Sequence, residues 1–210
     1  MQTFLCDLAY KYKSDKTDLY LRINKNQHCH NYTPYNYNIL KNKRLTTTNV
    51  LELGIGILDE RTMAHVADYD YNAGASLKVW RDFFPFAIIN GIDVNPKAIF
   101  LDERINTHIC SQVDENMLKK LFKNDKFDLI LDDGSHMPEH QLKSLDILLD
   151  YLKDDGVYII EDVYKDLFRD DFMVEVLGGV DLKGMMDIKE YNLREGRSVD
   201  NFFYEIRKRN

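Results

Sequence analysis

The chain has 210 residues, which is enough for one domain with a full core, and 44% of them are apolar. Its 28 Lys and Arg residues are outnumbered by 35 Asp and Glu residues, and the net charge of −7 argues against a nucleic-acid or anionic-membrane partner. Cys6, Cys29 and Cys110 share no metal-type spacing, which argues against a disulfide framework and a zinc site. The same cysteine pattern predicts a reduced, cytoplasmic setting, and no apolar run approaches the roughly 18 residues of a membrane span.

The first 48 residues carry a different pattern from the rest of the chain. Gln2–Tyr12 has mixed apolar spacing and predicts a helix. Lys13–Tyr37 is polar and rich in Asn and Tyr, but it contains too many aromatic side chains for a disordered tail. We interpret it as an ordered segment that covers another feature of the protein. A surface loop whose tyrosines pack locally fits the same pattern.

An apolar strand, Val50–Leu53, opens the second part of the chain and runs into Gly54 and Gly56. Glycines permit the tight turn and the close backbone approach that a bound cofactor needs. A dinucleotide fingerprint would have a third glycine three residues after Gly56, but Asp59 stands there, which weakens a nicotinamide interpretation. Glu52 is unusual inside a buried strand unless it meets a polar or cationic ligand.

The remaining patterns alternate between helix and strand. After an insertion at 57–72 they predict a helix at 74–84, a strand at 87–92, a short helix at 95–101, a strand at 107–110, a helix ending at 122, a strand at 127–131, a helix at 138–152, a turn at 153–156 and a strand at 157–160. Asp93 follows the second strand, where doubly wound nucleotide folds place the acid that binds ribose hydroxyls. Asp114 is a candidate N-cap. Segments 178–188 and 199–207 predict an antiparallel hairpin.

This alternation predicts an α/β fold, namely a doubly wound, mostly parallel, Rossmann-like sheet with helices on both faces and an antiparallel C-terminal edge hairpin. We expect a single domain overall. Residues 1–48 would form its N-terminal helix and tyrosine-rich segment, and residues 49–210 its core. The carboxyl ends of neighbouring parallel strands meet at one edge of a sheet, so the acids that follow the fourth and fifth strands should face one another.

Acidic side chains cluster where these two strands end. Asp132, Asp133 and His136 follow one strand, and Glu161 and Asp162 follow the other. Adjacent carboxylates repel each other, and the hard oxygen ligands Asp133, Glu161 and Asp162 favour Mg2+, or alternatively Mn2+ or Ca2+, over zinc. His136 is placed to act as a general base, because a free imidazole has a pKa of about 6.5. In the blander interpretation, Asp132 or Asp133 only caps the next helix and His136 is solvated.

Several stretches resemble known enzymes when they are taken in this order. Val50–Gly56, Gly91–Asp93 and Phe127–Asp133 resemble the class I S-adenosylmethionine-dependent methyltransferases. Other stretches resemble, more narrowly, the metal-dependent sugar O-methyltransferases of the macrolide mycinose and tylosin pathways. These are Lys13–Lys16, His30, Tyr32 and Thr33, the insertion before Gly74–Trp80, Gln112 with Asp114, Asp133–His136, and Glu161–Asp162. The resemblance covers most of the chain from Tyr10 to Asp162.

The resemblance implies a role for each site residue. Asp133, Glu161 and Asp162 would hold Mg2+, and His136 would be the base, with Asp133 and His136 as the catalytic pair. The residues expected to bind S-adenosylmethionine are Glu52, Gly54, Gly56 and Ser76 at its methionine part, Asp93 at its ribose, and Gln112 and Asp114 near its adenine, with Asp132 and Tyr32 completing the set. His30–Tyr37 becomes the candidate lid over the cofactor.

The expected acceptor is a hydroxyl of a sugar or sugar-containing small molecule, such as a nucleotide-sugar, a surface-polysaccharide precursor or a glycosylated natural product. A vicinal diol chelates Mg2+ through two oxygens, although a catechol or a phosphorylated small molecule would also do so. Two other functions stay open. The first is an Fe(II)-dependent hydroxylase-like enzyme, but its iron site would need two histidines, whereas this site has three acids and one histidine. The second is a non-catalytic nucleotide-binding module, which would not need the four site residues. A homo-oligomer also fits the aromatic N-terminal segment.

Overall fold

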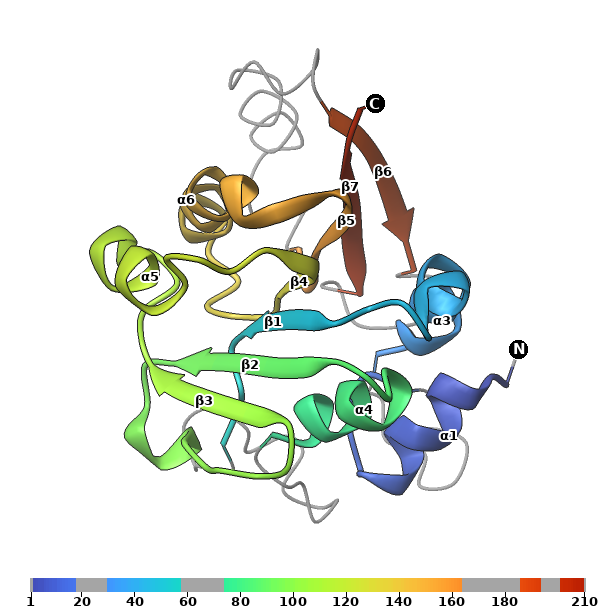
Figure 1. Ribbon diagram of the computed structural model, residues 1–210. Coiled ribbons are helices and arrows are strands. Elements are labelled where there is room, and N and C mark those ends of the chain that lie inside the picture. The colour runs from blue at the N-terminus through green and yellow to red at the C-terminus, as the bar shows by residue number, and fades with distance from the viewer. Residues whose placement is uncertain (1, 18–29, 58–73, 164–185, 194–200, 210) are drawn as a thin grey trace.

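The computed structural model of the chain describes residues 2–17, 30–57, 74–163, 186–193 and 201–209, and a seven-stranded sheet forms its centre (Figure 1). The strands are β1 (Asn49–Leu53), β2 (Ile88–Asp93), β3 (Ile105–Ile109), β4 (Phe127–Asp132), β5 (Leu152–Ile160), β6 (Met186–Asn192) and β7 (Phe202–Lys208). The α-helices are α1 (Phe4–Lys11), α3 (Thr33–Leu40), α4 (Ala75–Phe83), α5 (Glu115–Leu121) and α6 (Pro138–Leu148), and short 3-10 helices are η1 (Lys41–Lys43), η3 (Pro96–Ala98) and η4 (Leu149–Tyr151). No helix within the described ranges is long and apolar enough to cross a membrane.

The strands follow one another across the sheet in the order β3-β2-β1-β4-β5-β7-β6. The first five in the chain pair in parallel, and Val50 of β1 lies opposite Ile89 of β2 and Leu129 of β4. The chain starts in the middle at β1, moves out to β3 and then returns to β4, so the strand order reverses between β1 and β4. Ligands of doubly wound sheets bind beyond the carboxyl ends of the strands at such a reversal. The predicted mostly parallel, doubly wound sheet is confirmed.

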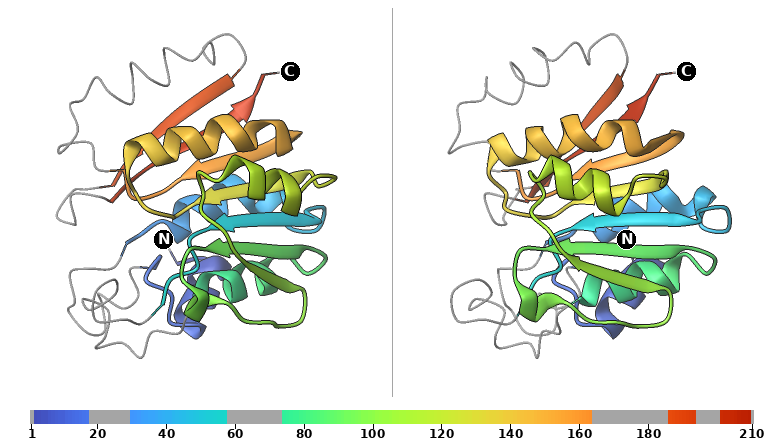
Figure 2. Two further views of the ribbon diagram at one scale, coloured as in Figure 1. Left: turned by 90° about the vertical axis from the view of Figure 1, so that its left-hand side faces the viewer. Right: turned by 60° about the vertical axis from the view of Figure 1, so that its left-hand side comes forward.

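Helices cover both faces of the parallel strands (Figure 2). Val50 and Leu129 point to the face that packs against α1, α3 and α4, where Trp80 is fully buried. The next residues along the same strands, Leu51 and Ile130, point to the opposite face, which α5 and α6 cover. Side chains of a strand alternate between faces, so a strand buried on both sides reads as a continuous apolar run. This is why the sequence pattern located these strands.

The N-terminal segment is ordered where it is described. Helix α1 begins at the N-cap Thr3, whose hydroxyl accepts from the Cys6 amide at 3.3 Å. The second helix, α3, has Pro34 in its first turn, and Tyr32 and Asn36 are buried. Residues 33–37 of the tyrosine-rich segment therefore lie in helix α3. Residues 18–29, and residues 58–72 of the predicted insertion, lie outside the described part of the chain.

The predicted turn at residues 153–156 was wrong, because β5 continues through it. The pairing register between β4 and β5 shifts there, because Phe127 of β4 pairs with Leu152 but Leu129 pairs with Val157. Residues 153–156 of β5 therefore have no partners in β4, and an ion pair stabilises this bulge. Lys153 binds Asp128 at 2.8 Å. An irregular strand accommodates such a polar insert without ending.

The C-terminal strands form the predicted antiparallel hairpin at the sheet edge. Tyr191 of β6 lies opposite Phe203 of β7, and their rings stack with centroids 4.3 Å apart. Strand β7 also pairs with β5, with Tyr204 opposite Ile160. The first hairpin strand was predicted at 178–188, but β6 runs from Met186 to Asn192, and residues 178–185 lie outside the described ranges.

Candidate active site

The loop after β1 passes directly against the end of β4. Gly54 has a φ of 86°, and a Cβ atom there would lie 2.1 Å from the carbonyl oxygen of Asp133. Only glycine fits a backbone that is both left-handed and in contact with another main chain. Beside it, Asp93 at the end of β2 accepts from the amides of Ile55 at 2.9 Å and Gly56 at 3.2 Å. The glycine turn and the predicted ribose-binding acid are thus brought together.

Glu52, in the middle of the sheet, is a fully buried carboxyl group. Neither of its side-chain oxygens has a hydrogen-bond partner among the described residues, and the ammonium of Lys16 is 3.7 Å away. Burial raises the pKa of Glu52 to about 8, and the charge of Lys16 and the nearby Ser76 hydroxyl offset this only in part. A buried acid with spare acceptor capacity suits a cationic or hydrogen-bond-donating ligand. Ser76 is itself buried in the first turn of α4.

Three of the predicted residues converge at the carboxyl ends of β4 and β5. Asp133, His136 and Asp162 offer ligand atoms that all lie within 4.8 Å of one another. The His136 Nε2 atom is 3.8 Å from Asp162 Oδ2. His136 and Asp162 both have left-handed backbones, with φ of 56° and 53°. Such residues cost about 1 to 3 kcal/mol each and concentrate at functional sites.

Glu161, the third predicted metal ligand, is held by the N-terminal segment. Its carboxylate accepts from the Lys16 ammonium at 2.5 Å and from the Asn36 amide at 3.0 Å. The same ammonium also bonds to Asp133 Oδ2. Burial raises the pKa of Glu161 to about 7 even though Lys16 opposes the shift. Lys16 therefore lies between two of the three predicted metal ligands, a contact that the sequence did not predict.

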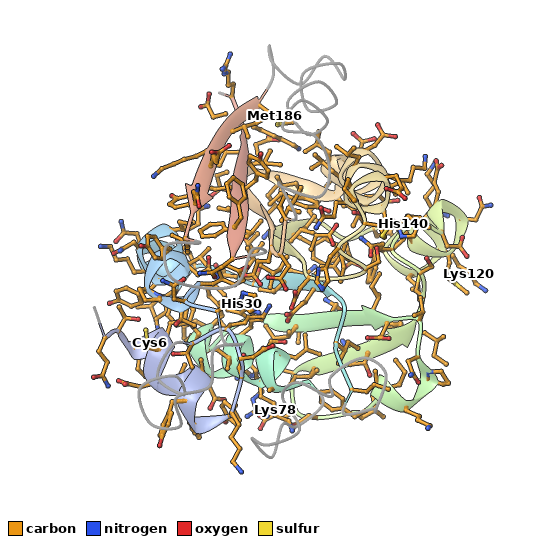
Figure 3. All side chains as sticks on the ribbon, turned by 180° about the vertical axis from the view of Figure 1, so that it is seen from behind. Cys6, His30, Lys78, Lys120, His140 and Met186 are labelled. Atoms are coloured by element: carbon orange, nitrogen blue, oxygen red, sulfur yellow. The ribbon has the colours of Figure 1, made fainter. Side chains whose placement is uncertain are left out.

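Asp162 lies next to the side chains of His30 and Tyr32 and of His136 in the loop after β4. Tyr32 donates from its hydroxyl to Asp162 Oδ1 at 2.5 Å, and His30 Nδ1 lies 3.5 Å from the same oxygen. Burial alone would raise the pKa of Asp162, but His30, His136 and the Tyr32 hydroxyl outweigh burial and lower it. Figure 3 shows His30 near the middle of the molecule, between the N-terminal helices and the sheet. The predicted lid thus contacts the acid cluster itself.

Asp132 and Gln112 lie on the other side of the same strand end and bind each other. Gln112 donates to Asp132 Oδ1 at 3.0 Å, and its oxygen accepts from the Ser135 amide at 2.7 Å. Ser144 of α6 also donates to Asp132. Burial raises the pKa of Asp132 to about 6. These contacts fix the turn that carries Asp133 and His136.

Asp114 caps helix α5, as its position in the sequence predicted. Its side chain accepts from the Met117 amide at 3.0 Å. Lys16 and Asn36, in contrast, were missing from the predicted site residues. The available signal was charge balance, because buried carboxylates at two strand ends require a cation. Sequence spacing could not identify which lysine supplies it, since Lys16 is 145 residues from Glu161.

The donor set suits a hard divalent cation. Glu52, Asp133, Glu161 and Asp162 are four acids around one described lysine ammonium, so the cluster carries excess negative charge when these acids are ionised. In the set Asp133, His136 and Asp162, two carboxylates and one imidazole match Mg2+ or Mn2+ better than zinc, which prefers Cys and His ligands. The residues present therefore fit the predicted Mg2+.

No family model matches the chain. Over 158 residues it is 33% identical to 8-demethyl-8-(2-methoxy-alpha-L-rhamnosyl)-tetracenomycin-C 3'-O-methyltransferase of Streptomyces olivaceus, an alignment that covers 75% of this chain and 36% of that protein. Over 136 residues it is 32% identical to demethylmacrocin O-methyltransferase of Streptomyces fradiae, covering 64% of this chain and 32% of that protein. The chain thus spans about a third of the length of these relatives.

A solved structure shows the same fold over almost the whole chain. It is the MycE methyltransferase from the mycinamycin biosynthetic pathway, in complex with Mg, SAH and mycinamycin VI. The TM-score is 0.73 at 22% identity, and the alignment covers 99% of this chain and 55% of that one. The chain therefore has the fold of the class I S-adenosylmethionine-dependent methyltransferases, and its predicted resemblance to the sugar O-methyltransferases of macrolide pathways is confirmed.

Proposed function

We propose that the protein is an S-adenosylmethionine-dependent and Mg2+-dependent O-methyltransferase that acts on a hydroxyl of a sugar or a sugar-containing small molecule. The observation that carries this proposal is the convergence of Asp133, His136 and Asp162 next to the glycine turn at Gly54. Similarity supports it, because one relative is named as a 3'-O-methyltransferase of a rhamnosyl compound, and MycE was solved with Mg and with SAH, the demethylated form of that cofactor.

The cofactor half of the site would be formed by the ends of β1, β2 and β3. Glu52 and Ser76 would bind the methionine part, with the glycine turn from Gly54 to Gly56 allowing close approach. Asp93 would bind the ribose hydroxyls. Gln112 and Asp114 would lie near the adenine, with Asp132 acting through its bonds to Gln112, and Tyr32 would close the site from the N-terminal side.

The acceptor half would be formed by the ends of β4 and β5. Asp133, Glu161 and Asp162 would hold the ion, for which Mn2+ or Ca2+ are alternatives. Bound Mg2+ makes a coordinated hydroxyl more acidic. His136 would accept the proton that the hydroxyl loses, and Asp162, with its nearest oxygen 3.8 Å away, would stabilise the imidazolium. Aligning the acceptor oxygen with the methyl group could contribute roughly 7 to 11 kcal/mol to catalysis.

The acceptor class follows from the ion. A vicinal diol of a sugar presents two neighbouring oxygens to one cation, so a sugar, a nucleotide-sugar or a glycosylated natural product would fit this site. Hydrogen bonds from the protein would then choose between the two hydroxyls. The chain spans only part of the length of its relatives, so their acceptors define a panel of sugars to test.

The test is calorimetric titration of S-adenosylmethionine into the wild type and Asp133→Asn, followed by mass spectrometry of a panel of diol-bearing sugars with Mg2+ or with EDTA. We expect the cofactor to bind both proteins. Methylated product should form only with wild type and Mg2+. Asp146→Asn, which changes an exposed acid on α6, should behave like the wild type. Absence of binding heat with the cofactor, in the presence and absence of Mg2+, would refute the proposal.

A further inference from the structure

Lys16 is a buried lysine in the middle of an acidic site. Only 6% of its side chain is exposed, and its ammonium bonds to Asp133 Oδ2 and to Glu161 Oε2. The carboxylate of Glu52 is 3.7 Å away. Lysine is almost never fully buried unless it is paired. The three acids supply that pairing from the ends of β1, β4 and β5.

The main chain of Lys16 is fixed, but its side chain can move without it. The Lys16 carbonyl accepts from the Thr33 amide at 3.2 Å, and the neighbouring Asp15 carbonyl accepts from the His30 amide at 2.8 Å. The Ser14 amide donates to the Ala9 carbonyl at 2.9 Å. The loop is thus anchored to α1 and to the segment before α3. Four rotatable side-chain bonds connect this anchored loop to the ammonium, so the charge can withdraw while the loop stays in place.

An ammonium and a divalent ion cannot share the same two carboxylates. Mg2+ binds oxygen at about 2.0 to 2.1 Å, so an ion held by Asp133 and Glu161 would occupy the volume in which the Lys16 ammonium lies. The two cations would also repel each other strongly at that distance. Either the ion displaces Lys16, or Glu161 keeps Lys16 and the ion is bound by other residues.

We propose that Lys16 is an exchangeable internal cation, which neutralises Asp133 and Glu161 and is displaced from them when a divalent ion binds. This inference rests on the metal ligands of the proposed function. It assigns to Lys16 control of metal affinity, because the ion must replace an existing ion pair. The competing arrangement keeps Lys16 on Glu161 and binds the ion through Asp133, His136 and Asp162 alone.

The first test measures Mn2+ affinity by the electron paramagnetic resonance signal of the free ion, with wild type, Lys16→Met and Lys11→Met. Lys11 is a matched control, since it is 59% exposed and pairs with Asp82 outside the cluster. Lys16→Met should bind Mn2+ at least about tenfold more tightly, because one positive charge within a few ångströms is gone. Lys11→Met should match the wild type. Equal or weaker binding by Lys16→Met would overturn the exchange.

A second test uses the wild type, so it does not depend on the folding of a variant. An amine-reactive acylating reagent is applied with and without saturating Mn2+, and modification of Lys16 is quantified by peptide mass spectrometry. Modification should increase when Mn2+ is bound, whereas an unchanged or lower yield contradicts the proposal. If Mn2+ binds wild type and Lys16→Met equally, only the exchange fails. If it binds neither, the metal part of the proposed function fails as well.

Discussion

The hydroxyl of Tyr32 allows a direct test of the link between the N-terminal segment and the acid cluster. Tyr32→Phe removes the donor to Asp162 at 2.5 Å but keeps the ring, which is 1% exposed, stacks on His30 and packs edge-on against Phe203. A hydrogen bond to a charged group is worth about 1.5 to 3 kcal/mol. Only 13% of the Asp162 side chain is exposed, so water cannot fully replace the lost hydrogen bond. We therefore expect urea denaturation to show a free energy of unfolding lower by about 1.5 to 3 kcal/mol, and a Tm lower by about 3 to 12 °C.

The matched control is Tyr35→Phe in α3, the helix that follows Tyr32. Tyr35 is 36% exposed, and its ring also packs against Phe203, with centroids 6.4 Å apart. Loss of its hydroxyl should change the unfolding free energy by less than about 0.5 kcal/mol. The Tyr32 variant should also raise the pKa of Asp162, because the hydroxyl is one of the groups that lower it. Equal stability of Tyr32→Phe and the wild type would show that Tyr32 does not hold this acid.

Two further predictions concern the ends of β1 and β4. Gly54→Ala should lower the free energy of unfolding by more than the roughly 1 to 2 kcal/mol of a left-handed alanine, because its Cβ would also lie 2.1 Å from the Asp133 carbonyl oxygen. Urea denaturation measures this free energy. A variant within about 1 kcal/mol of the wild type would contradict the prediction. In metal-free buffer the folded state holds the Glu52 proton more tightly than the unfolded state, since the pKa is about 8 against 4.5. The free energy of unfolding should therefore fall as pH rises through that window, and Glu52→Gln should make the fall shallower. An unchanged pH slope in that variant would mean that Glu52 is not protonated in the folded protein.

The parallel strands could be predicted because burial on both faces leaves a local signal. Phe127–Leu131 is apolar except for Asp128, and β4 contains all of it. Helix α3 left no such signal, since it buries Thr33, Asn36 and Leu40, and only Leu40 of these is apolar. Its only indication was Pro34 near the start. Local periodicity therefore recovered the sheet and missed a helix whose stability comes from contacts with distant residues.

The acid cluster could be predicted in part for a similar reason. Asp133 and Glu161 follow apolar strands, and parallel strands bring their carboxyl ends together, so topology placed both acids at one edge. The partners of these acids come from a segment more than 100 residues earlier, and Lys16 pairs with Asp133 across 117 positions. Nothing in the local pattern of residues 13–17 distinguishes this lysine from Lys13 or Lys11. Its role followed only from the folded arrangement.

The position of β7 between β5 and β6 sets an order of assembly during synthesis. Strand β6 leaves the ribosome before β7, yet its neighbour in the described sheet is β7. The five parallel strands can pair as they emerge, whereas β6 has no ladder to join until Phe202–Lys208 has been made. During that interval the outer edge of β5 is an unpaired strand edge, of the kind that promotes association between nascent chains. A chain truncated before residue 202 should therefore self-associate more than the full chain, which size-exclusion chromatography would detect.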